Sequence, residues 1–313
     1  SSLEDIDIPR NVSSVGANAF KGTAMLNYQI ANAGPLYYAD TWVIGSTSGI
    51  ETIIDGSTPI KSGTTGIADN TFRGCTKLSN VAIPNTVKYI GDSAFENCGE
   101  LAIITIPSSV ESIGGYAFSN CSRLTTMDIP NNVKNMGNGV FYNCTKLSEI
   151  KLSTSLGAIG ISAFEGCKLL TAVDIPASVV SIGDKAFYGC SGLNTITINN
   201  AKCEIYDSGN TINKTPITIC GAKGSTAESY ATKYNKTFKE VSSSGVKGDA
   251  NGDGVLRASD AAFIAKKLAE ASISGSKVTI TAYPNADFNG DGKITAADAA
   301  AIAKYLAEQS IKK

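Results

Sequence analysis

Hydrophobic and polar positions recur along most of the chain with a fixed period of 23 residues. A phenylalanine marks each period, and a cysteine follows it three residues later. The phenylalanines are Phe72, Phe95, Phe118, Phe141, Phe164 and Phe187, and the cysteines are Cys75, Cys98, Cys121, Cys144, Cys167 and Cys190. Self-similarity at this period predicts a solenoid, in which each unit buries its apolar face only by stacking on the next unit.

Within each unit, the segment L-x-x-[IVM]-x-[IL] alternates in the way a β-strand does. In one unit Leu124, Met127 and Ile129 are expected to point inward, with Thr126 and Asp128 outward. Proline closes most of these segments, where its missing N–H ends the hydrogen-bond ladder. A V-x-x-I-G run then supplies further inward apolar groups before a glycine turn. The pattern predicts a curved parallel sheet with irregular or short helical segments behind it.

The period is broken once, because Phe20 and Phe72 lie 52 residues apart where two periods would span 46. We therefore expect a hairpin insertion within about residues 21–70. This insertion carries the best aromatic candidates for a ligand site: Tyr28, Tyr37, Tyr38 and Trp42. Residues of about 200–241 are typical of a cap, with a small-residue turn, one short helix and a final strand that covers the open end of the core.

The repeat motif A-F-x-x-C-x-x-L-x-x-I-x-I-P-x-x-V-x-x-I-G resembles the BspA-type leucine-rich repeats of bacterial surface and secreted proteins. The resemblance covers residues 1–241 and implies a leucine-rich-repeat solenoid. Outward strand positions are small, polar and mixed in charge, as on an ordinary solvated sheet face, and they identify no ligand. Because the first residues, "SSLEDIDIPRNV", read as the middle of a repeat, we expect further sequence upstream.

The cysteine column has two readings. Residues stacked in register point the same way, and cysteine is a good small buried hydrophobe, so free buried thiols are favoured over disulfides between neighbouring units. Cys203 and Cys220 lie outside the column near the cap, where a bridge between them and two free thiols are both open.

Composition narrows the function further. The chain has 27 basic and 28 acidic residues and no histidine. A balanced charge without basic runs disfavours nucleic acid as a partner. The missing histidine removes the commonest general acid–base group and imidazole metal ligands, so a non-catalytic chain is expected. No apolar stretch approaches the ~20 residues that a bilayer span requires.

The pattern changes after a linker at residues 242–247, where two acidic, glycine-studded loops each precede an alanine-rich helix. Counted from the first aspartate of each loop, oxygen ligands fall at positions 1, 3, 5, 7 and 12 of a calcium loop, position 7 through its carbonyl. They are Asp249, Asn251, Asp253, Val255 and Asp260, and then Asp287, Asn289, Asp291, Lys293 and Asp298. Hard oxygen ligands select calcium over softer ions, so we predict two calcium ions in a small all-α duplicated loop–helix domain.

This duplication resembles a dockerin, a module that docks onto the cohesin of a scaffoldin in cellulose-degrading assemblies. The resemblance covers residues 248–313 and implies cohesin contact at loop positions 10 and 11 and on the following helix face. These positions are Ala258, Ser259, Phe263, Lys266 and Lys267 in the first copy, and Ala296, Ala297, Ala301, Lys304 and Tyr305 in the second. Two features depart from the common pattern: position 12 is aspartate, where an ordinary EF-hand has glutamate, and alanine dominates where better-known dockerins carry paired hydroxyls.

Three functions remain open from the sequence. The first is a non-catalytic extracellular component, secreted or at the cell surface, that docks through calcium and presents the repeats for protein or surface binding. The second is the C-terminal part of a cellulosomal enzyme whose catalytic domain lies upstream. The third, a catalytic or enzyme-inhibiting solenoid, has the least support because no pocket motif is present.

Overall fold

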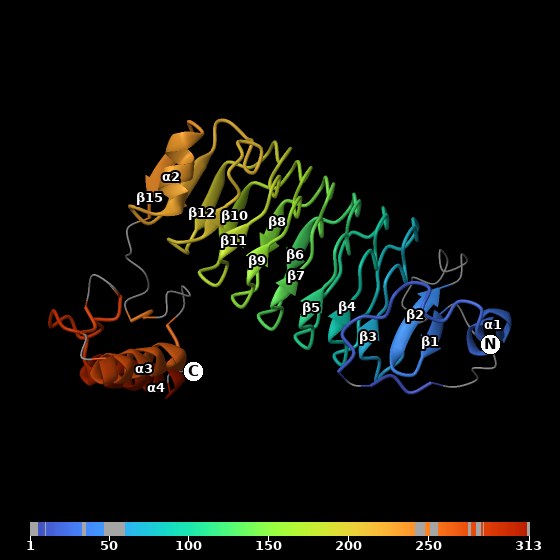
Figure 1. Cartoon of the computed structure of the whole chain (residues 1–313), viewed down its shortest axis with the longest axis horizontal. Coiled ribbons are helices and arrows are strands. Elements are labelled where there is room, and N and C mark those ends of the chain that lie inside the picture. The colour runs from blue at the N-terminus through green and yellow to red at the C-terminus, as the bar shows by residue number, and fades with distance from the viewer. Residues whose placement is uncertain are drawn as a thin grey trace.

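The computed structural model describes residues 6–9, 11–32, 36–46, 60–241, 248–250, 256–274, 277–279, 283 and 285–311. Between residues 60 and 241 the chain winds into a stack of similar turns, one per repeat (Figure 1). The leucine-rich-repeat solenoid predicted from the 23-residue period is therefore confirmed. Among the described residues no helix is long and apolar enough to cross a membrane.

One long face of the solenoid carries the strands predicted from the L-x-x-[IVM]-x-[IL] segments of the later repeats, whereas the equivalent segments at residues 78–83 and 101–106 form no strand, so the prediction was wrong there. Neighbouring strands are parallel and offset by one whole repeat, so that Met127 pairs with Ile150 and Val173 with Ile196. β6 pairs with β8 in one sheet, and β10, β12, β14 and β15 form a second sheet in that order. Their bounds are β6 Thr126–Asp128, β8 Glu149–Lys151, β10 Ala172–Ile175, β12 Thr195–Ile198, β14 Thr218–Gly221 and β15 Thr237–Glu240.

A second parallel ladder, which the sequence did not predict, runs along the V-x-x-I-G segments. Its strands are only two residues long within the repeats, and each pairs with the next at the same one-repeat offset. Together with β2 (Trp42–Ser46) of the N-terminal region, they lie in the orders β2-β3-β4-β5-β7 and β9-β11-β13. Their bounds are β3 Gly66–Ile67, β4 Tyr89–Ile90, β5 Ser112–Ile113, β7 Asn135–Met136, β9 Ala158–Ile159, β11 Ser181–Ile182 and β13 Glu204–Ile205.

The phenylalanine column fills the space between the two faces. Consecutive rings from Phe72 to Phe187 stack with centroids 5.0–5.7 Å apart and planes within 12° of parallel. The rings are 2% exposed or less. Each rung thus buries its ring only against the rungs beside it, as the repeat pattern predicts.

The cysteine column is made of free thiols, as expected. The Sγ–H of each cysteine from Cys98 to Cys190 donates to the carbonyl of the phenylalanine 26 residues earlier, at Sγ–O distances of 3.0–3.2 Å. Burial raises the pKa of Cys144 well above its usual value and that of Cys190 to about 12. Cys203 and Cys220 are also free and buried, so no bridge joins them.

The N-terminal region departs from the regular stack. The stretch expected as a hairpin insertion contains helix α1 (Ala24–Asn32) and an antiparallel hairpin of β1 (Leu36–Ala39) and β2 (Trp42–Ser46). Strand β2 pairs in parallel with β3 and takes the ladder position that the first repeat would have filled. Phe20 accordingly stays outside the ring column and packs in a separate small core with Trp42.

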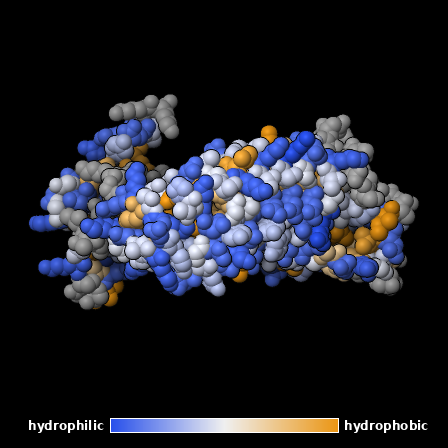
Figure 2. All heavy atoms as spheres, turned by 90° about the horizontal axis from the view of Figure 1, so that it is seen from above, coloured by the Kyte–Doolittle hydropathy of each residue, from blue (hydrophilic) through white to orange (hydrophobic). Residues whose placement is uncertain are grey.

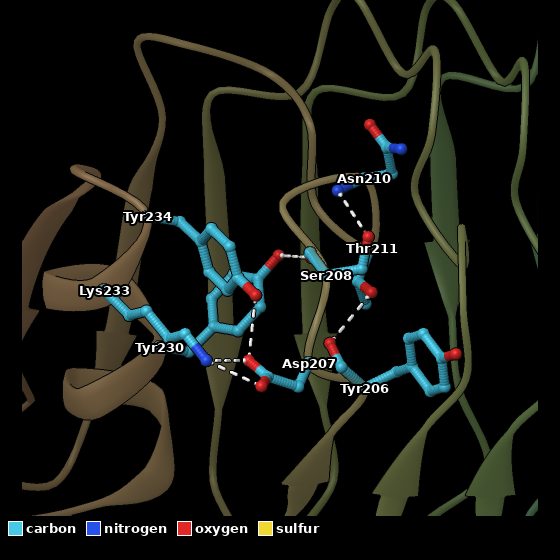
Figure 3. Close-up of polar contacts among 8 residues, drawn as sticks. All are labelled: Tyr206, Asp207, Ser208, Asn210, Thr211, Tyr230, Lys233 and Tyr234. Carbon is cyan, nitrogen blue, oxygen red and sulfur yellow. Dashed lines mark hydrogen bonds and ion pairs between the residues drawn. The ribbon is translucent and has the colours of Figure 1, made fainter.

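Helix α2 (Thr226–Lys233) and strand β15 close the C-terminal end of the solenoid core. Helix α2 begins at Ser225, whose hydroxyl accepts the Glu228 N–H at 3.3 Å as an N-cap. Figure 3 shows how α2 is fixed to the loop after β13. The Tyr230 hydroxyl donates to the Ser208 carbonyl at 2.8 Å, and Lys233 and Tyr234 both bind the Asp207 carboxylate. These bonds hold the cap over the last rung.

Candidate functional site

The two C-terminal loops each lead directly into a helix, as predicted from the duplicated motif. The helices α3 (Ala258–Ser274) and α4 (Ala296–Ile311) pack against each other. Each begins with the same cap, in which an aspartate of the first turn accepts the N–H of the residue before the helix. Asp260 accepts from Arg257 N at 2.7 Å, and Asp298 accepts from Thr295 N at 2.8 Å. Both carboxylates are fully buried.

The second loop wraps its backbone around the carboxylate at position 1. The oxygens of Asp287 accept the N–H groups of Gly290, Asp291 and Gly292 at 2.7–3.1 Å. At the other end of the loop, Asp298 Oδ1 accepts the Asn289 N–H at 3.1 Å. The predicted positions 1, 3 and 12 therefore all take part in hydrogen bonds within the loop.

The remaining second-loop positions take part in the same set of hydrogen bonds. Asn289 Nδ2 donates to Asp291 Oδ2 at 3.1 Å, and Asp291 Oδ1 accepts the Lys293 N–H at 2.9 Å. Asp291 and Lys293 are exposed. All three carboxylates of this loop, on Asp287, Asp291 and Asp298, accept backbone N–H groups, which fixes their positions. Its candidate ligands are all oxygen atoms, which suits a hard cation such as calcium.

In the first loop the predicted positions 3, 5 and 7, Asn251, Asp253 and Val255, lie outside the described residues. Asp249 and Asp260 are described, and they are 3% and 0% exposed. Across the described part of the chain, no group of three or more aspartate, glutamate, histidine or cysteine side chains is positioned to hold a metal ion. The two calcium sites therefore stay predictions that fit the donor chemistry.

A small apolar core lies beneath the two loop–helix copies. It is built on Ile264 of α3, Ile294 of the second loop and Ile302 of α4. The residues at position 8, Leu256 and Ile294, both pack in this core.

The segment between the two copies is tied into the same small core. Gly248 adopts φ +93° beneath the Phe288 ring, where a side chain would overlap that ring, and its N–H donates to Asn285 O at 2.8 Å. Tyr283 meets Phe263 edge-on with centroids 5.4 Å apart.

The predicted contact faces of the two copies differ in exposure. In the second copy Ala296, Ala297, Lys304 and Tyr305 are exposed and Ala301 is half-buried. In the first copy Ala258, Ser259 and Lys266 are exposed, whereas Phe263 and Lys267 are half-buried.

Internal contacts explain the half-buried residues of the first copy. Phe263 packs edge-on against Tyr283, and Lys267 Nζ lies 5.6 Å from the centre of the Phe263 ring. Lys267 also pairs with Glu270 at 2.7 Å, and this bond raises the pKa of Lys267. Part of the predicted contact face of the first copy therefore packs against other residues of the same domain.

The outward strand face of the solenoid shows no dense charge patch or aromatic platform along its described strands. Its clearest polar feature is an ion pair between Lys151 and Asp128 at 3.5 Å. Figure 2 shows a mainly hydrophilic surface over the repeats, with hydrophobic residues in small separate spots. Neither the sequence pattern nor the described residues identify a ligand for this face. The aromatic candidates of the insertion divide: Tyr37 and Trp42 are buried, whereas Tyr28 is 69% exposed.

Comparison with known proteins divides the chain in the same way. A family model of the BspA-type leucine-rich repeat region matches residues 1–41 and 57–171 in 6 copies. A model of the dockerin type I domain matches residues 247–307. No curated protein matches the chain.

Three solved structures illustrate the similarity. The leucine-rich repeat protein TpLRR of T. pallidum is 26% identical, with 59% of this chain and 81% of that chain covered and a TM-score of 0.43. A leucine-rich repeat protein from Bacteroides ovatus is 22% identical, with 66% and 68% covered and a TM-score of 0.36. The pneumococcal vaccine antigen PcpA is 20% identical, with 74% and 54% covered and a TM-score of 0.43.

Proposed function

Because the chain carries a BspA-type leucine-rich repeat region and a dockerin type I domain, we propose that it is a non-catalytic extracellular component of a cellulosome-type assembly. Its dockerin docks in a calcium-dependent manner to a cohesin on a scaffoldin, and its repeats are presented for protein or surface binding. Both recognised domains are of non-catalytic types. The observation that carries this proposal is the dockerin match over the duplicated loop–helix copies. We further propose residues 1–241 as the repeat domain, 242–247 as the linker and 248–313 as the dockerin.

Dockerin type I domains bind calcium, and we assign two ions to this one. The proposed ligands are the ten loop residues at positions 1, 3, 5, 7 and 12 of the two copies. Support comes from the second loop, where the Asp287 carboxylate accepts three backbone N–H groups and Asp298, in the first turn of α4, accepts the Asn289 N–H. Calcium would offset the mutual repulsion of the aspartates that each loop gathers, and it would stabilise a domain with a small apolar core.

Cohesin contact is assigned to the second copy. The supporting observation is the difference in exposure between the copies. Tyr305 is exposed on α4, whereas the corresponding first-copy residue Lys267 is half-buried and paired with Glu270, and Lys304 is exposed like its counterpart Lys266. Exposed Ala296 and Ala297 add a small flat surface at the start of α4, where a partner backbone can approach closely.

Calorimetry against a panel of type I cohesins, with calcium and then with chelator, tests this function. We expect tight binding to at least one cohesin, complete loss on chelation, and unchanged affinity for an isolated fragment of residues 242–313. Failure of every cohesin to bind while calcium still binds would contradict docking as the role of this domain.

The duplication supplies a matched pair of variants for the contact face. Ala296→Arg with Ala297→Glu places charge and bulk on the second copy, and Ala258→Arg with Ser259→Glu makes the same change on the first. We expect the second-copy variant to lose about 100-fold in affinity, because a charge buried unpaired in an interface costs several kcal/mol, and the first-copy variant to stay within about threefold. A larger loss from the first-copy variant would overturn the assignment of the face.

A further inference from the structure

A cavity of about 480 Å³ lies where the N-terminal segment crosses the hairpin and the first regular rungs. Its wall includes Asp7, Asp40, Trp42, Lys88 and Tyr89. Figure 1 shows this region at the end of the solenoid that carries β1 and β2. The cavity is separate from the dockerin loops and plays no part in the docking proposed above.

The Tyr89 ring, backed by the buried Trp42 indole, forms one wall of the cavity. The Trp42 indole lies across Gly66 of the next strand, where a Cβ would stand 2.5 Å from the ring. Glycine at this position lets the indole reach Tyr89 of the following rung, so that the two rings stack with centroids 6.0 Å apart and planes 5° from parallel. Tyr89 is half-buried, so part of its ring stays accessible from the cavity.

The hairpin turn fixes the opposite rim. Asp40 adopts φ +49° in the turn between β1 and β2, and its Oδ2 accepts the Ile8 N–H at 3.1 Å. This bond holds the N-terminal segment against the hairpin, where Ile8 packs in the small core with Trp42. The rim therefore places the exposed carboxylates of Asp7 and Asp40 beside the aromatic wall.

Charge on this rim is unbalanced toward acid. Lys88 is the one basic residue that lines the described cavity, and its Nζ lies 3.3 Å from a carboxylate oxygen of Glu111. Among the described residues that line the cavity, two acidic side chains, Asp7 and Asp40, stand against one basic side chain, Lys88, which also pairs with Glu111. An aromatic wall beside carboxylates attracts a cation by its ring quadrupole and by direct charge.

We propose that this cavity binds the guanidinium group of an arginine side chain presented by a protein partner. A guanidinium is planar, so it stacks on an aromatic face, and its forked N–H donors match a carboxylate. The aliphatic stem of arginine would lie against Ile8 and Pro9, which also line the cavity.

The chain reports occupancy of this site directly, because Trp42 is its only tryptophan. Titration of the full chain with N-acetyl-arginine amide should change the Trp42 fluorescence in a saturable way. We expect a millimolar Kd, as for a single side chain, and binding about tenfold weaker for the neutral isostere N-acetyl-citrulline amide. Added salt should weaken binding of the arginine probe and leave that of citrulline unchanged.

An Asp7→Asn variant tests the carboxylate without removing the aromatic wall. Asp7 is exposed, so the variant keeps its fold, and we expect about tenfold weaker binding of the arginine probe. Asp174→Asn, an exposed aspartate on strand β10 outside the cavity lining, is the matched control and should bind as the parent does. The proposal is overturned if citrulline binds as well as arginine, if Asp7→Asn binds unchanged, or if cellobiose changes the Trp42 signal and arginine does not.

Discussion

The ring column predicts a specific difference between two truncations. Phe141 lies between Phe118 at 5.7 Å and Phe164 at 5.5 Å, whereas Phe187 meets one ring of the column, Phe164, at 5.2 Å. Phe141 and Phe187 are both fully buried. Replacing either residue with alanine deletes a fully buried phenylalanine ring, but the two changes break different numbers of ring contacts.

The magnitude follows from burial and from ring stacking. Truncating a buried phenylalanine costs about 3–5 kcal/mol in the free energy of unfolding, including the cavity left behind. Each stacked pair adds about 0.5–1.5 kcal/mol beyond the buried area. We therefore expect Phe141→Ala to lie at the upper end of the range and to cost about 1 kcal/mol more than Phe187→Ala.

Urea unfolding followed by far-ultraviolet circular dichroism measures both costs, and Trp42 fluorescence follows the N-terminal end separately. In a solenoid each rung contacts only its neighbours, so Phe141→Ala should also separate the two transitions. Equal costs at Phe141 and Phe187 would refute the contribution of ring stacking. A cost below about 2 kcal/mol at Phe141 would refute the central place of the column in the core.

Three further predictions concern other parts of the molecule. Burial raises the pKa of Cys203 to about 11 and that of Cys190 to about 12 from an ordinary value of 9.0. The stabilisation that the two buried neutral thiols give the folded state is therefore complete below pH 9 and declines as the pH rises toward these values. Urea midpoints that stay constant from neutral pH to about pH 11 would contradict this prediction. Removal of calcium by a chelator should unfold α3 and α4 and leave the unfolding transition of the solenoid unchanged. In a calcium titration the first loop should bind more weakly than the second, because position 9 is Arg257 in the first loop and Thr295 in the second. Equal calcium affinities of the two loops would refute this difference. Tyr230→Phe removes the hydroxyl between Ser208 O and Ile212 N and should cost about 1–3 kcal/mol in thermal or urea unfolding, whereas Tyr206→Phe, on a ring that is 55% exposed, should change little.

The predictable parts of the fold are those whose sequence pattern recurs in every repeat. The strand at Thr126–Asp128, the buried ring of Phe141 and the free thiol of Cys144 follow from the alternation and the fixed spacing. The second ladder was missed because a strand such as Asn135–Met136 has two residues, too few to show a period of two. Its existence depends on stacking between rungs, which a single repeat does not display.

The N-terminal region was harder to predict because its structure depends on which segment pairs with β3 in the folded chain. Phe20 carries the repeat motif, yet β2 pairs with β3 and excludes the first repeat from the ladder. Helix α1 was also missed in a stretch read as a hairpin insertion.

The candidate calcium loops were readable because ligand positions along a short loop are set by local spacing. The hydrogen bonds that Asp287 and Asp298 accept from the loop backbone agree with that spacing. The difference in exposure between the copies depends on Tyr283, which lies far from Phe263 in the sequence and packs against it only in the fold.

The register between rungs has a consequence for the reach of the molecule. Every pairing between strands of the repeats joins equivalent residues of consecutive repeats, as Met127 with Ile150 and Thr126 with Glu149, whereas the cap strand β15 pairs with β14 at a shorter offset, Thr218 with Thr237. A unit can therefore be inserted or deleted without changing any type of contact in the units that remain. The separation of the two ends of the repeat region is then fixed in steps of one strand spacing, about 4.8 Å. The number of repeats, more than the chemistry of their surface, therefore sets how far apart the two ends of the repeat region are held.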